Sequence, residues 1–332
     1  MMIYRVVHAA LSALGVGLNA VLMIIALLKS PKNLRMLMMV IVVQTLTEIL
    51  TSLVNAFTMT RILTDGVHIV LIPAGYCNQF RPFSCYALYM LSTWCQEFSL
   101  IWQIASYVFR HLILRPTSSQ NLDEEIICIS TISLAIPTFF HVATWMTFFN
   151  ETESIIKPEH LGLERSRNVI LTGSHVRYST MTAFFLLANL SLLALLAVGW
   201  IRKVIKDYTR GMGGFSRTAK KHNKTLLKIY TFQACLPIFT LLGVLIFALQ
   251  FFGFFQYEHL DQMIFPIFML SPILAPMAYL LHVPQYNKLF KIRRSPRSDT
   301  VVLEESTPMG GTPKAEKRQN SVTFNTHNDV IL

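Results

Sequence analysis

The chain has 332 residues, of which 53% are hydrophobic and only 14% are charged, and its mean hydropathy is +0.46. Soluble domains carry about 25% charged residues, so this composition excludes a water-soluble globular protein and favours a membrane protein. The net charge of +11 predicts attraction to anionic lipid headgroups, and nucleic-acid binding is the less favoured alternative.

Seven apolar runs follow one another along the chain, and each is long enough for an α-helix to cross a hydrocarbon core of about 30 Å. The pattern predicts an all-α membrane protein, with a seven-transmembrane helix bundle over residues 1–283. The runs are Val6–Leu28, Met36–Thr58, Phe83–Leu112, Glu125–Phe149, Tyr178–Trp200, Thr225–Phe254 and Met263–Val283.

The basic residues are shared unequally between the two sides of these runs. Of the 29 lysines and arginines, 22 fall on the side that holds the C-terminus and the other seven on the opposite side. Cytoplasmic loops carry the excess of lysine and arginine. We therefore expect the N-terminus outside and the C-terminus in the cytoplasm.

The residues after the last run differ in composition from the bundle. Apolar and basic residues alternate over 284–294, which predicts a short basic helix on the inner membrane surface, against anionic lipids. Residues 295–332 are polar and rich in serine, threonine and proline, so we expect a disordered cytoplasmic tail.

Two carboxylates, Glu48 and Glu97, fall near the middle of apolar runs, with no lysine or arginine at their depth. An intramembrane carboxylate is costly and usually faces the bundle interior. Each must be protonated, bound to a cation, or held in a polar network. Because Trp94, Gln96 and Trp102 surround Glu97 in sequence, these four residues are the candidate ligand-binding set.

Prolines within the runs, which include Pro237, Pro272 and Pro276, predict kinks that let the helices move. Cys77 and Cys85 lie at the outer end of the third run, where they either pair as a disulfide or remain free. No CxxC pair or His/Cys cluster is present, so we expect no metal and no cofactor.

Five motifs between residues 15 and 290 resemble the nematode serpentine chemoreceptors, best those of class delta (Srd) in the Str superfamily of G-protein-coupled receptors. Each is weak alone, but they occur in the order that the family shows. They are "GVGLN" with "SPKNL", "GYCNQFRPFSCYALY", "YVFRHLIL", "HNKTLLKIYTFQACLPIF" and "SPILAPMAYLLHVPQYNKLF".

The resemblance implies a chemosensory receptor, with a small-molecule ligand bound in the outer half of the bundle and a heterotrimeric G protein inside. It assigns Arg110 and His111 to G-protein coupling, although His111 stands where a tyrosine is usual. The alternative for Arg110 is an arginine that reaches the lipid headgroups. It also implies that Asn19 belongs with Glu48 to a buried polar network.

The resemblance places the protein in the plasma membrane, and in particular in the cilia of sensory neurons, where such receptors are usual. It implies no enzymatic activity. Asn150 begins an Asn-x-Thr sequon on the expected outer side, so it is a candidate glycosylation site. A seven-helix channel or solute transporter is the alternative function. No inverted repeat and no line of charges across the bundle supports it.

Overall fold

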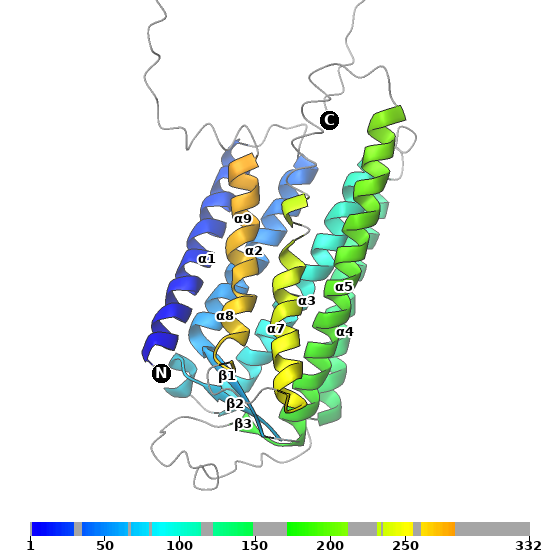
Figure 1. The fold of residues 1–332 in the computed structure, drawn as a ribbon. Helices are drawn as coiled ribbons and strands as arrows, with labels where there is room; N and C mark the ends of the chain where they lie inside the picture. Colours follow the sequence, from blue (N-terminus) through cyan, green and yellow to red (C-terminus); the bar gives the residue numbers. More distant parts are fainter. Residues whose placement is uncertain are drawn as a thin grey trace, which may run out of the picture.

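The structure is a computed structural model, and the residues that it describes are 2–29, 35–65, 68–79, 82–113, 122–148, 171–211, 231–233, 235–254 and 260–282. Long helices run roughly side by side, and a small sheet covers the end of the bundle at which the first helix begins (Figure 1). The last helix ends at the opposite end. The expected segments 284–294 and 295–332 lie outside the described residues.

The first five apolar runs are helices, as expected. Their bounds agree with the sequence to within a few residues, except that the fifth helix begins earlier and ends later. They are α1 (Met2–Lys29), α2 (Arg35–Thr58), α3 (Pro82–Ile113), α4 (Leu122–Phe148) and α5 (Ser174–Gly211).

The sixth and seventh runs are interrupted helices. In the sixth, residues 231–233 are helical, and α7 (Leu236–Phe251) then begins with Pro237 in its first turn. The seventh is divided at Met269 into α8 (Ile264–Phe268) and α9 (Leu270–His282). Proline has no N–H group to donate, so it fits the first turn of a helix and disrupts the interior.

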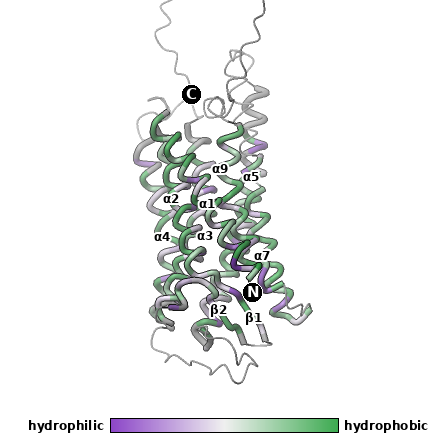
Figure 2. The backbone as a smooth tube through the Cα atoms, turned by 90° about the vertical axis from the view of Figure 1, so that its left-hand side faces the viewer, coloured by the Kyte–Doolittle hydropathy of each residue, from purple (hydrophilic) through white to green (hydrophobic). Residues whose placement is uncertain are grey.

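Six described stretches are long and apolar enough to cross a membrane, and Figure 2 shows the helices coloured mainly as hydrophobic. The helix that does not meet this measure is α3, which packs against α2, α4 and α5. Helix α3 is less apolar than this measure requires because polar side chains lie on its buried faces. They are Ser92, Thr93, Glu97, Ser99, Gln103 and Ser106.

The expectation of an all-α chain is wrong between α2 and α3, where the described residues form two strands. Strand β1 (Thr60–Asp65) pairs antiparallel with β2 (His68–Pro73), and β2 pairs with β3 (Leu171–Thr172), just before α5. The pairing of Asp65 with His68 leaves two residues between the strands. Asp-Gly at 65–66, between runs rich in β-branched residues, is a hairpin signal that our reading of the sequence missed.

A close backbone contact joins the ends of the hairpin to α2. The Gly75 N–H donates to the Thr58 carbonyl at 3.0 Å, and the Ala74 N–H donates to the Met59 carbonyl at 3.2 Å. A Cβ atom on Gly75 would lie 2.2 Å from the Phe57 carbonyl oxygen, a distance at which backbone atoms collide. Only glycine therefore lets the chain turn back here after the hairpin.

The hydrophobic core beneath the sheet joins strands and helices. It contains Leu71 from β2, Tyr89 from α3, Phe184 from α5 and Phe265 from α8. Between α5 and α7, the Phe184 and Phe247 rings lie 4.1 Å apart, centroid to centroid. The sheet is thus part of the bundle's packing, because its buried side chains are continuous with those of the helices.

Candidate functional site

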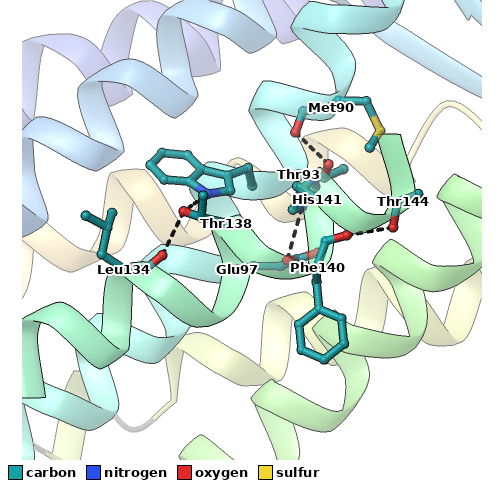
Figure 3. Close-up of polar contacts among 9 residues, drawn as sticks. Met90, Thr93, Glu97, Leu134, Thr138, Phe140, His141 and Thr144 are labelled. Carbon is teal, nitrogen blue, oxygen red and sulfur yellow. Dashed lines mark hydrogen bonds and ion pairs between the residues drawn. The ribbon is translucent and has the colours of Figure 1, made fainter. Parts of the chain in front are cut away.

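Glu97 has a partner that the sequence did not indicate, a histidine from the neighbouring helix. His141 of α4 places Nε2 3.1 Å from Glu97 Oε2, as Figure 3 shows between the two helices. The Glu97 side chain is 1% exposed and the His141 side chain 13%. An imidazole can donate or accept a hydrogen bond and can carry a positive charge. This buried carboxyl group therefore has an imidazole as its partner and not a lysine or an arginine.

On the same turn of α3 as Glu97, other polar atoms have no partner among the described residues. They are Glu97 Oε1 and both amide atoms of Gln96. Trp94 is engaged, because its indole N–H donates to Thr138 Oγ1 at 3.2 Å, on the same side of α4 as His141. Buried polar groups without partners cost roughly 1–3 kcal/mol each. Gln96 and Glu97 thus offer a donor and acceptors to another molecule.

Trp102, the fourth predicted ligand residue, faces a different helix. Its indole N–H donates to the Val40 carbonyl of α2 at 3.1 Å. The Phe98 ring lies between Trp94 and Trp102, with centroid distances of 5.6 and 5.8 Å. These three rings form an aromatic column along α3, so Trp102 packs against α2 while Glu97 bonds to α4.

Glu48 lies in a separate polar group between α2 and α3. Gln44 Nε2 donates to Glu48 Oε1 at 2.7 Å and to Ser99 Oγ at 2.9 Å, and the Ser99 hydroxyl donates to Glu48 Oε1 at 2.5 Å. All three side chains are buried. The structure therefore holds this carboxyl group by hydrogen bonds from neighbours on both helices.

Asn19 does not join Glu48. Its amide donates to the Gly15 carbonyl at 2.8 Å and to the Pro272 carbonyl of α9 at 2.7 Å. In a regular helix, the carbonyl of residue 272 would accept from the N–H of residue 276, which is proline and has none. The amide of Asn19 therefore bonds to the oxygen that Pro276 leaves free, and this contact joins α1 to α9.

The ion pair between Arg61 and Asp261 connects the sheet to the turn before α8. The Arg61 Nε–H donates to Asp261 Oδ2, and the two residues are 9% and 5% exposed. Arg61 is one of the seven basic residues that fall on the expected outer side. Burial raises the pKa of Asp261, although the Arg61 guanidinium acts in the opposite direction. The sheet thus holds a buried cation because the neighbouring turn supplies an anion.

The two outer cysteines lie in one core cluster. Cys77, in the short 3-10 helix η2 (Tyr76–Gln79), and Cys85, at the start of α3, are both buried and both free. Burial raises the pKa of the Cys77 thiol, and the adjacent Cys85 adds to the rise. Their disulfide stays a prediction.

The structure adds no contact for three other predicted residues. Arg110 and His111 belong to the last described turn of α3, but their side chains lie outside the described part of the structure, as does Asn150. Coupling and glycosylation at these positions remain predictions. His141 was missed although its sequence carried a signal, since an imidazole in an otherwise apolar run needs a polar partner.

The comparisons with known proteins agree with this architecture. Residues 4–292 match the family model described as "Serpentine type 7TM GPCR chemoreceptor Srd". The chain is 40% identical over 287 residues to serpentine receptor class delta-28 of Caenorhabditis elegans, which covers 86% of this chain and 88% of that protein.

Two further relatives from Caenorhabditis elegans are similar. Serpentine receptor class delta-26 is 37% identical over 298 residues, covering 89% of this chain and 92% of its own length. Serpentine receptor class delta-30 is 38% identical over 290 residues, covering 87% and 88%. With six apolar spans among the described residues and matches along nearly its whole length, the chain belongs to the class delta (Srd) serpentine chemoreceptors, a family of seven-transmembrane G-protein-coupled receptors.

Proposed function

We propose that this protein is a chemosensory receptor of the plasma membrane that binds a small molecule beside Glu97 and His141 and activates a heterotrimeric G protein. The observation that carries the ligand site is the pairing of Glu97 with His141, on the turn of α3 that also holds Gln96, whose amide atoms have no partner among the described residues. In a low-dielectric bundle, such groups gain most from a ligand that forms hydrogen bonds.

The same geometry supports a hydrogen-bonding ligand over a simple cation. A cation would need the full charge of Glu97, but one carboxylate oxygen already faces His141. The free oxygen and the Gln96 amide can instead receive a ligand hydroxyl, carbonyl or amine, with the Trp94 ring nearby for an apolar part. Ligand identity would then be set by shape and hydrogen-bond pattern together.

We also propose that α3 crosses the membrane as well, which brings the number of transmembrane helices to seven, with the sheet end of the bundle outside the cell. The low apolarity of α3 follows from its buried polar faces, and its 32 residues exceed the roughly 20 that a span needs. The seven-to-22 division of basic residues supports the orientation. Binding would shift the population of bundle conformations, with movement at the interruptions beside Pro237 and Pro272.

A dose–response series tests this function. Cells that express the receptor and a calcium indicator are screened with odorant pools, and the most active pool is applied to Glu97→Gln and Arg110→Ala. We expect Glu97→Gln to raise the half-maximal dose about tenfold or more, because a charge-assisted contact is lost. Arg110→Ala should remove the maximal response and spare surface delivery.

Matched variants separate these effects from general damage. Glu48→Gln changes a second buried carboxyl group that bonds within the bundle, and Arg202→Ala changes an exposed basic residue of α5. Both should leave the half-maximal dose and the maximal response near those of the unchanged receptor. Equal behaviour of Glu97→Gln and Glu48→Gln would refute the ligand site, and a full response from Arg110→Ala would refute the coupling role.

A further inference from the structure

A second group of buried polar atoms lies away from Glu97, at the sheet end of the bundle. Four side chains from α1, α7 and the turn before α8 contribute atoms that have no hydrogen-bond partner among the described residues. We call them the under-sheet cluster: His8 (both ring nitrogens), Ser12 (Oγ), Gln250 (Oε1) and Asp261 (Oδ1).

These residues are well buried, and printed contacts near them run from His8 through Tyr4 and strand β1 to Asp261. His8 is 0% exposed, Ser12 1%, Asp261 5% and Gln250 9%. The Tyr4 ring lies 5.5 Å from the ring of His8, centroid to centroid. The Tyr4 hydroxyl donates to the Thr60 carbonyl at 2.8 Å, next to the arginine that pairs with Asp261.

The backbone places the cluster at one end of the bundle, where α8 contacts α1, α7 and β1. His8 and Ser12 are four residues apart, so they lie on the same face of α1 as Tyr4, and this face is buried against the bundle. Gln250 is near the end of α7, and both α7 and α8 contact β1. In Figure 1 the start of α1, the end of α7 and the start of α8 all lie at the end that the sheet covers.

Such a concentration of unpaired atoms requires an explanation, because native proteins leave only a few buried polar groups unsatisfied. The atoms are mainly acceptors: Asp261 Oδ1, Gln250 Oε1 and one nitrogen of a neutral His8 ring. The arginine beside Asp261 offsets its charge, so a charged ligand gains little. A hydroxyl group donates to such acceptors and also accepts from the His8 N–H.

We infer that the under-sheet cluster is a binding site for an uncharged, hydroxyl-bearing part of a small molecule. It is separate from the contact between Glu97 and His141. The inference rests on the proposed function only in that the bound molecule would be the receptor's ligand or a part of it. The sheet covers this site, and the Tyr4 hydroxyl and Asp261 join the sheet to the helices beside it.

The test compares two thiol reagents of nearly equal shape on the full-length Ser12→Cys receptor in membranes. The probes are 2-hydroxyethyl and n-propyl methanethiosulfonate, which differ by a hydroxyl in place of a methyl group. Both cross membranes, so the expected orientation does not affect the result. Labelling of the peptide that contains residue 12 is followed by mass spectrometry, and each rate is divided by the reagent's rate with 2-mercaptoethanol.

We expect the hydroxyethyl probe to react about threefold to tenfold faster than the propyl probe at residue 12, the factor that an ordinary hydrogen bond supplies. Adding His8→Leu should remove this preference, which distinguishes recognition by the side chain from simple hydration. At Ala13→Cys, on the exposed face of α1, and at Leu22→Cys, in an apolar core, the hydroxyethyl probe should have no advantage.

Equal rates, a faster propyl probe, or no labelling of Ser12→Cys in a receptor that reaches the surface would overturn the inference. A preference that persists in the His8→Leu background would also overturn it. The labelling needs no G protein and no native ligand. Its failure is therefore distinguishable from failure of the proposed signalling function, which the calcium response measures.

Discussion

The ion pair between Arg61 and Asp261 is the contact whose loss should most weaken the sheet end of the bundle. In Arg61→Ala, Asp261 keeps its buried carboxyl group but loses the guanidinium that bonds to it. Breaking one partner of a buried ion pair costs about 3–5 kcal/mol, because the remaining charge stays buried without compensation. The two side chains are only 11% and 6% exposed, so solvent screens their charges little and this range needs no large reduction.

The assay is thermal unfolding of the purified, detergent-solubilised receptor, followed by circular dichroism. Arg61→Ala and Asp261→Ala are measured singly and together. The double variant should be less destabilised than the sum of the two single variants, since it leaves no unpaired charge. Arg5→Ala, which changes an exposed basic residue at the same end of the bundle, is the control and should shift stability by less than about 0.5 kcal/mol.

Two outcomes would refute this reasoning. If Arg61→Ala unfolds at the same temperature as Arg5→Ala, the ion pair does not hold the sheet to the helices. If the single effects add without coupling, the two side chains do not depend on each other. Either result would also remove one of the contacts that join β1 to the rest of the bundle beside the under-sheet cluster.

Three other changes test separate features of the fold. Asn19→Leu should cost about 1–3 kcal/mol in thermal unfolding, because the Pro272 carbonyl loses its donor; an unchanged midpoint would contradict the contact. Gly243→Ala places a Cβ atom 2.3 Å from the Phe268 ring and should lower the free energy of unfolding by about 1–3 kcal/mol. At Gly199→Ala the Cβ atom meets no other part of the bundle within 4 Å, so no such loss is expected. Burial raises the pKa of Asp261, so the folded chain binds that proton more tightly than the unfolded chain. The contribution of Asp261 to the free energy of unfolding should therefore fall as the pH rises from 3.8 through the raised pKa. Asp261→Asn should remove this dependence on pH.

The sequence alone determined the membrane class, the positions of the helices and the family. Helix positions could be read because each span needs about 20 apolar residues in succession, a local property of the chain. The family could be read because its motifs are also local and ordered. The positions of Glu48 and Glu97 within apolar runs identified them as polar groups in need of partners, without naming those partners.

Only the tertiary structure decided which side chains meet. Glu97 bonds to His141, 44 positions away, Asn19 to the Pro272 carbonyl, and Arg61 to Asp261. Each contact depends on how helices or strands pack and rotate against one another. A distance in sequence does not encode this arrangement. The hairpin carried a local signal at 65–66, but the burial of its Arg61 depends on Asp261, which lies 200 residues away in the sequence. The sequence shows which buried polar groups need hydrogen-bond partners, and only the packing of helices and strands decides which groups become those partners.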